Sequence, residues 1–183
     1  MNREKYVDNE VFGIMMEHLR EVTVELFGAY ELPIQPLAGD DAAQLTTSER
    51  SAAAIIGFAG EKVRGALILC ASNTSIERWM AVLGAGPGEE NDTLGEFSNM
   101  LLGRLKGRLL AEGVTLLLST PTTTSGSDLR LSPPLVQSGT QFFAGDDWSV
   151  MARLDATFDA GFSRGASSSS MEAAAEAGDA MLF

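Results

Sequence analysis

The sequence predicts an α+β fold in which a unit made of a long helix and strands occurs twice. The strands form an antiparallel sheet, and the long helices pack on it. Two long segments have apolar residues at helical spacing, and each is followed by segments with strand character. A hairpin turn follows in each half, and the two hairpins share a sequence echo, Phe58-Ala59-Gly60-Glu61 and Phe143-Ala144-Gly145-Asp146. Matching element order together with this echo favours a repeated unit.

The first unit begins with an amphipathic helix predicted over residues 7–27. Its apolar residues recur every three or four positions: Val11, Met15, Leu19, Val22 and Leu26. Asp8 is the expected N-cap and Gly28 the expected end of the helix. The segment Leu32–Leu37 is expected to be extended, because each of its two prolines biases the preceding residue away from helix.

The first hairpin is predicted from two apolar runs, Ser51–Ala59 and Val63–Ala71. Gly60-Glu61-Lys62 lies between them and is typical of a tight turn. A short helix over Ser75–Leu83 follows, and Gly84 ends it.

The second unit starts with a long helix, capped by Asn91 or Asp92 and ending near Glu112 before Gly113. Val114–Ser119 is predicted to be a strand. The next segment, Thr120–Gly126, is predicted to be a polar loop. A last hairpin is expected from two runs on either side of a Gly-Asp-Asp turn, Thr140–Ala144 and Trp148–Phe158.

The chain of 183 residues fits one domain, expected over residues 1–160. Residues 161–183 are mostly Ser, Ala, Gly and acidic residues, so we expect an acidic disordered tail. The net charge of −12 argues against nucleic-acid binding and against a hold on anionic membranes. No run approaches the ~20 apolar residues that span a bilayer. With no signal peptide expected either, the predicted location is the cytoplasm.

Metal and nucleophile chemistry is limited by one cysteine, Cys70, and one histidine, His18. An internal disulfide is excluded, and so is a zinc site built from Cys and His ligands. A Ser-His-Asp triad would have to use His18, which lies in a predicted helix. Cys70 ends an apolar run, so it is interpreted as a buried structural thiol.

The second long helix has two faces with different roles. An apolar stripe predicts the core face: Leu94, Phe97, Leu101, Leu105 and Leu109. Glu96, Asn99 and Gly103 fall nearly opposite, with Gly107 close by. Each glycine in an exposed helix costs about 1 kcal/mol relative to alanine, and local stability gives no reason for two of them. This face therefore indicates a flat contact surface with one carboxylate and one carboxamide.

A carboxamide can orient a water molecule, because it donates and accepts hydrogen bonds at once. Hydrolysis of a phosphoryl group depends mostly on positioning and charge neutralisation. An Asn inserted into a site that already holds the metal and the phosphoryl group would supply the missing oriented water. The spacing of Glu96 and Asn99 alone also occurs by chance on solvated helices.

The segment Gly95–Gly103 resembles the G-E-x-x-N-x-x-x-G signature of the CheC/CheX/FliY chemotaxis phosphatases. Two further segments resemble the same family and occur in its order. One is Phe58-Ala59-Gly60 followed by Gly65–Leu69, and the other is Ser119-Thr120-Pro121-Thr122 with Gly126. The resemblance covers about residues 5–160.

The resemblance implies dephosphorylation of a phosphorylated CheY-like receiver domain. It would make Asn99 the residue that positions the water and Glu96 the residue that pairs with the receiver's lysine. Gly95, Gly103 and Gly107 are expected to contact the partner. Mg²⁺ is expected on the receiver, and no cofactor or metal is expected on this chain.

Family members of the CheC type carry E-x-x-N in both units, whereas the first helix here lacks it. Its glutamates, Glu10, Glu17, Glu21 and Glu25, are followed three residues later by Gly13, Arg20, Val24 and Gly28. The chain therefore resembles the CheX type, which implies one site per chain and a homodimer. Two alternatives remain open: a non-catalytic module that docks a receiver or another signalling partner, and a structural protein of the flagellar switch type.

Overall fold

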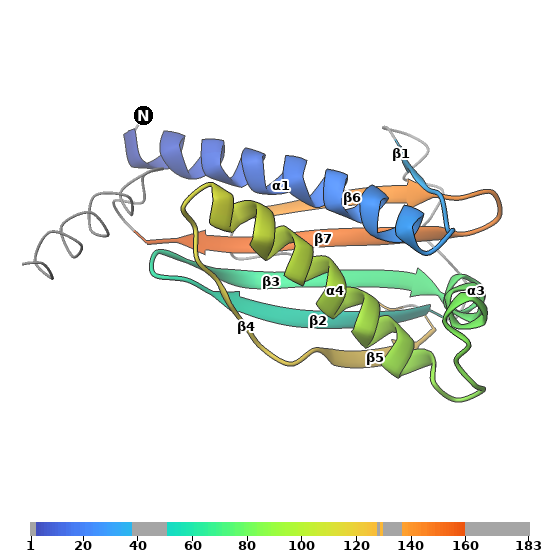
Figure 1. Cartoon of the computed structure of the whole chain (residues 1–183). Coiled ribbons are helices and arrows are strands. Elements are labelled where there is room, and N and C mark those ends of the chain that lie inside the picture. Colours follow the sequence, from blue (N-terminus) through green and yellow to red (C-terminus); the bar gives the residue numbers. More distant parts are fainter. Residues whose placement is uncertain (1–2, 38–50, 128, 130–136, 160–183) are drawn as a thin grey trace, which may run out of the picture.

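The structure is a computed structural model that describes residues 3–37, 51–127, 129 and 137–159, with side chains described from Glu10 onward. The predicted tail, residues 161–183, lies outside the described residues. Within the described ranges, a seven-stranded antiparallel sheet is covered on one face by two long helices, α1 and α4 (Figure 1). The predicted α+β class is confirmed.

The first unit comprises α1 (Arg3–Ala29), β1 (Gln35–Leu37), β2 (Ser51–Ala59) and β3 (Val63–Ser72). The short helix α3 (Asn73–Leu83) connects it to the second unit. The second unit comprises α4 (Glu90–Ala111), β4 (Leu117–Leu118), β5 (Thr122–Gly126), β6 (Gln137–Ala144) and β7 (Ser149–Phe158). These bounds confirm both predicted hairpins and all three predicted helices to within a few residues.

The strand order β1-β6-β7-β3-β2-β4 shows how the two units combine. The hairpins meet where β3 pairs with β7, and β1 and β5 each pair with the other unit's hairpin, β1 with β6 and β5 with β2. The hairpins also share a register: Phe58 pairs with Gly65, and Phe143 pairs with Val150. The same spacing separates Phe58 from Phe143 and Gly65 from Val150, so the repeated unit is confirmed at the level of single residue pairs.

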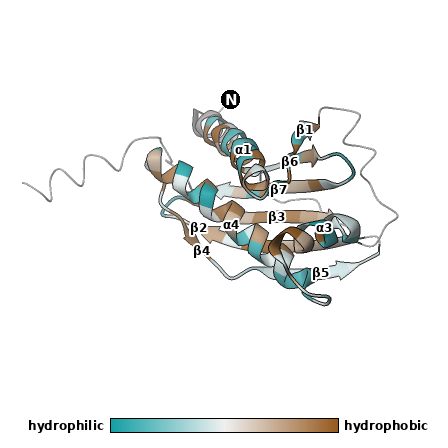
Figure 2. Cartoon of the chain, turned by 45° about the vertical axis from the view of Figure 1, so that its right-hand side comes forward, coloured by the Kyte–Doolittle hydropathy of each residue, from teal (hydrophilic) through white to brown (hydrophobic). Residues whose placement is uncertain are grey.

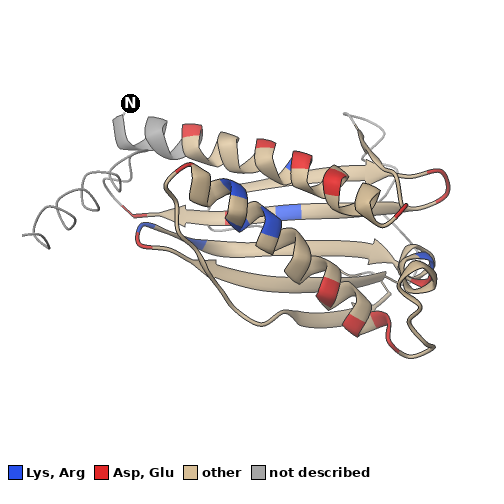
Figure 3. Ribbon diagram, viewed as in Figure 1, with Lys and Arg blue, Asp and Glu red and all other residues tan. Residues whose placement is uncertain are grey.

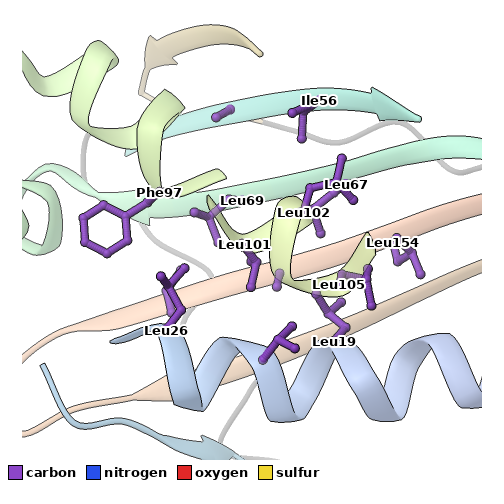
Figure 4. Close-up of a cluster of buried hydrophobic side chains, with 14 of the residues drawn as sticks. Leu19, Leu26, Ile56, Leu67, Leu69, Phe97, Leu101, Leu102, Leu105 and Leu154 are labelled. Atoms are coloured by element: carbon purple, nitrogen blue, oxygen red, sulfur yellow. The ribbon is translucent and has the colours of Figure 1, made fainter. Parts of the chain in front are cut away.

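The core lies between the sheet and the two long helices. Leu19 and Leu26 of α1 and the apolar stripe of α4 are buried against β2, β3 and β7, with Ile56, Leu67 and Leu154 as representative sheet partners (Figure 4). Burying each leucine removes enough apolar surface from water to contribute about 1.5–3 kcal/mol. The leucines of α4 therefore determine which side of this helix packs on the sheet.

Two sequence expectations about strands were wrong. Residues 120–126 are not a loop, because Thr122–Gly126 form β5 at the edge of the sheet, where Ala53 pairs with Thr124. Threonine is β-branched and suits an edge strand, yet the segment is hydrophilic (Figure 2) and so resembled a loop. The predicted strand over Val114–Ser119 is reduced to Leu117–Leu118.

The predicted helix caps were also partly wrong. Asp8 lies inside α1, which begins at Arg3, and α1 passes Gly28 to end at Ala29. Asn91 and Asp92 lie in the first turn of α4 rather than at its cap. Gly84 and Gly113 follow their helices with φ of 70° and 81°, as expected for glycine stops. None of the helices in the described ranges is long and apolar enough to cross a membrane.

Candidate functional site

The side of α4 that faces away from the sheet forms a continuous exposed surface. Glu96, Asn99, Gly103, Gly107 and Leu110 are all exposed there, and we call them the exposed strip. Leu94, Phe97, Leu101, Leu105 and Leu109 are each at most 1% exposed on the opposite side. The two faces predicted for this helix are therefore both present.

Glu96 and Asn99 are neighbours on the exposed strip, because side chains three residues apart meet on a helix surface. Among the described residues, neither side chain makes a hydrogen bond or an ion pair. The carboxylate and the carboxamide are therefore free to contact a second molecule at the same time.

Gly103 and Gly107 leave the backbone of α4 bare beside this pair. A Cβ added at either position would have no neighbouring atom within 4 Å, and neither residue has a positive φ. No packing or conformational requirement explains these glycines. Bare backbone does allow close approach by another surface.

The expectation that Gly95 contacts a partner is corrected, because Gly95 is buried. A Cβ added there would lie 3.6 Å from Cγ2 of Thr123 and 3.7 Å from Cγ of Pro121. Gly95 thus packs α4 against the edge strand β5. On the helix wheel it lies about 20° from the buried Leu102 and about 100° from Glu96.

An aromatic cluster that the sequence did not indicate supports the N-terminal half of α4. The Phe97 ring lies 5.0 Å from those of Phe27 and Trp79 and 5.4 Å from that of Tyr30, measured between centroids. The Tyr30 hydroxyl lies 3.1 Å from the sulfur of Met100. Phe97 and Met100 flank Glu96 and Asn99 in sequence, so these contacts fix how the pair is presented. The nearest sequence signal was the aromatic pair Phe27 and Tyr30 at the end of the first helix.

His18 and Cys70 lie elsewhere. His18 sits between α1 and α4, with ring nitrogens 3.7 Å from Glu21 and 3.8 Å from Glu112, and belongs to an interhelix polar cluster. Cys70 is partly buried, and burial raises the pKa of its thiol. In the described part of the chain, no three His, Cys, Asp or Glu residues come together in a group that could hold a metal ion.

Charge is distributed unevenly along α4. Glu90, Asp92 and Glu96 lie in its N-terminal half, whereas Arg104, Lys106 and Arg108 lie in its C-terminal half (Figure 3). Arg108 is paired with Glu25, which neutralises it locally. Acidic residues therefore lie around one end of the exposed strip, and Arg104 and Lys106 flank its other end.

The family model "Chemotaxis phosphatase CheX" matches residues 52–144, which is half of the chain and includes α4. The chain therefore belongs to the CheX family. No curated protein matches it.

Solved structures share the fold at low sequence identity. CheX from Vibrio vulnificus superposes with a TM-score of 0.62 at 19% identity, covering 78% of this chain and 93% of that one. A CheC-like protein from Shewanella sp. PV-4 gives 0.63 at 19%, covering 86% and 99%. The CheX–CheY–BeF₃–Mg²⁺ complex from Borrelia burgdorferi gives 0.59 at 15%, covering 77% and 96%. These likenesses establish the fold.

Proposed function

We propose that this chain hydrolyses the phospho-aspartate of a CheY-like receiver domain. The observation that carries the proposal is the pair of Glu96 and Asn99 on the exposed strip, which has no partner within the described part of the chain and lies beside two bare glycines. This geometry allows two polar side chains to enter a site on another protein. Membership of the chemotaxis phosphatase family supports the reaction class.

In the proposed mechanism, Asn99 holds a water molecule in line with the phosphoryl group. Its carboxamide accepts a hydrogen bond from the water and donates one to a neighbouring oxygen. The water oxygen forms a bond to phosphorus, the bond to the aspartyl oxygen breaks, and the proton of the water passes to solvent with the released phosphate. The Asn99 side chain contributes positioning, which is the main contribution that protein groups make to phosphoryl transfer.

Glu96 fixes the docking in this proposal by pairing with the receiver's lysine through a charge-assisted hydrogen bond. The Mg²⁺ ion that neutralises the phosphoryl oxygens belongs to the receiver. The Borrelia burgdorferi complex supports the assignment of Mg²⁺ to the receiver, since it contains CheY together with BeF₃ and Mg²⁺.

We also propose that the chain forms a homodimer with one site per subunit and acts in the cytoplasm, where receiver domains are phosphorylated. The single E-x-x-N pair supports the CheX-type assignment. In α1, Glu10 is followed three residues later by Gly13, whereas in α4 Glu96 is followed three residues later by Asn99. Light scattering at micromolar concentration tests the dimer, and a monomer would contradict it.

The test is phosphate release from a phosphorylated receiver domain in the presence of Mg²⁺. Wild-type chain is expected to accelerate the release, and Asn99→Ala and Glu96→Ala to lose most of the acceleration. If both variants accelerate release like wild type, the exposed pair has no catalytic role. If neither wild type nor the variants accelerate release but wild type still binds the receiver, the protein is a docking module that does not catalyse hydrolysis.

A further inference from the structure

The charge pattern along α4 points to a docking surface with a fixed direction. Arg104 and Lys106 lie about 80° to either side of Glu96 on the helix wheel, so they flank the exposed strip. Among the described residues, neither makes a hydrogen bond or an ion pair. In a chain with a net charge of −12, two unpaired bases beside a bare helix surface call for an explanation.

The helix dipole does not provide that explanation. Cations stabilise a helix when they lie in its last turn, and the effect falls off beyond it. Arg108 is the basic residue in the last turn of α4, and it is already paired with Glu25. Arg104 and Lys106 lie further from the end, so local helix stability gains little from them.

The spacing along α4 separates the two charged ends electrostatically. At 1.5 Å per residue, Arg104 and Lys106 lie about 12–15 Å from Glu96 along the axis. This exceeds the screening length of about 8 Å at physiological ionic strength. Glu96 at one end, and Arg104 and Lys106 at the other, therefore each interact electrostatically with the part of a partner that lies directly opposite them.

The exposed strip also ends in an apolar side chain. Leu110 is 57% exposed and lies about 40° from Glu96 on the wheel, near the basic end of the strip. Glu96, Asn99, Gly103, Lys106 and Leu110 alternate spacings of three and four residues, the pattern with which one helix packs along another elongated element. Single exposed leucines are common, but this one continues the line of the proposed site.

We propose that the basic end of α4, formed by Arg104, Lys106 and Leu110, docks an acidic surface with an apolar spot on the same receiver domain that Glu96 and Asn99 engage. This inference rests on the proposed function. The receiver's lysine faces the acidic end, and its acidic surface faces Arg104 and Lys106. A receiver turned by 180° would place like charges opposite each other at both ends, so the pattern selects one orientation.

The test measures binding, independently of hydrolysis, to a panel of CheY-like receiver domains activated with beryllofluoride and Mg²⁺. The variant Arg104→Glu/Lys106→Glu is expected to weaken binding at least tenfold. The loss is expected mainly in the association rate, and it should be largest at low salt. Arg20→Glu reverses the charge of a base on α1 that is exposed, as Arg104 is, and serves as the control, expected to stay within twofold of wild type.

Leu110→Asp is expected to weaken binding several-fold, mainly through faster dissociation. Val82→Asp is its control, since Val82 is 44% exposed and lies on α3. Circular dichroism checks the fold, and Arg104→Gln/Lys106→Gln replaces the reversal variant if that one does not fold.

Binding of Arg104→Glu/Lys106→Glu within twofold of wild type would overturn the inference and leave the proposed function standing. If wild type binds a receiver but does not accelerate hydrolysis, the proposed function is refuted. The docking surface is then still tested by comparing the affinities of wild type and Arg104→Glu/Lys106→Glu. Wild type that binds no receiver would overturn both.

Discussion

The ring of Phe27 in α1 is stacked on the ring of Phe97 in α4, with centroids 5.0 Å apart and planes inclined by 14°. Both rings are fully buried. This contact joins the first helix of one unit to the site helix of the other. Phe97 follows Glu96 in the chain and points about 100° away from it around the helix, so the stack sets the rotation of α4 that leaves Glu96 exposed.

Phe97→Ala is expected to lower the free energy of unfolding by about 3–5 kcal/mol, since it removes a ring packed among three aromatic neighbours. Urea denaturation monitored by circular dichroism measures this change. Leu110→Ala, at a side chain 57% exposed, is the control and should change stability by no more than about 0.5 kcal/mol. Equal effects of the two substitutions would contradict the assigned faces of α4.

Gly103→Ala and Gly107→Ala are each expected to raise stability by up to about 1 kcal/mol, because alanine favours the helix and a Cβ meets no neighbour. Each is also expected to lower kcat/KM for receiver dephosphorylation, because the added methyl group separates the two surfaces. Gly13→Ala is the matched control on α1, where a Cβ likewise has no neighbour within 4 Å. It should raise the melting temperature without loss of activity. Full activity of the Gly103 and Gly107 variants would show that the bare backbone is not a contact surface.

Gly95→Ala is expected to change stability little, since its Cβ would make ordinary contacts with Pro121 and Thr123. Gly95→Leu is expected to destabilise by about 1–3 kcal/mol, because the longer side chain must displace β5. Thermal unfolding of the two variants compares them directly. Equal stability of both would show that β5 does not pack closely on α4 at this position.

Cys70 is expected to react slowly with a thiol reagent in the native protein, because burial raises its pKa above the usual value of 9.0 and lowers the thiolate fraction. The rate should rise with pH and increase further in urea. Since the folded state retains the thiol proton more strongly, this contribution to stability is present below pH 9 and is lost as the pH rises further. Equal reaction rates in native and denatured protein would contradict this burial.

The sequence was most informative where local pattern and tertiary packing agree. The leucine stripe of α4 specified its buried face, and the hairpin turns specified the bounds of β2 and β3. The strand β5 could not be predicted, because a polar threonine run becomes a strand only by pairing with β2, which is distant in sequence. The burial of Gly95 depends on that same pairing. The aromatic cluster under the site joins residues from three helices and a turn, and no local periodicity reveals it.

The most direct test of the central claim is the rate of phosphate release from a phosphorylated receiver domain with Asn99→Ala compared with Asn91→Ala. Both variants remove an exposed carboxamide from α4, and only Asn99 lies on the exposed strip. Asn99→Ala is expected to lower the stimulated rate at least 100-fold, which corresponds to about 2.7 kcal/mol of barrier, with unchanged stability, whereas Asn91→Ala is expected to keep the wild-type rate. Equal rates for both variants and wild type would contradict the assignment of Asn99 as the residue that positions the attacking water.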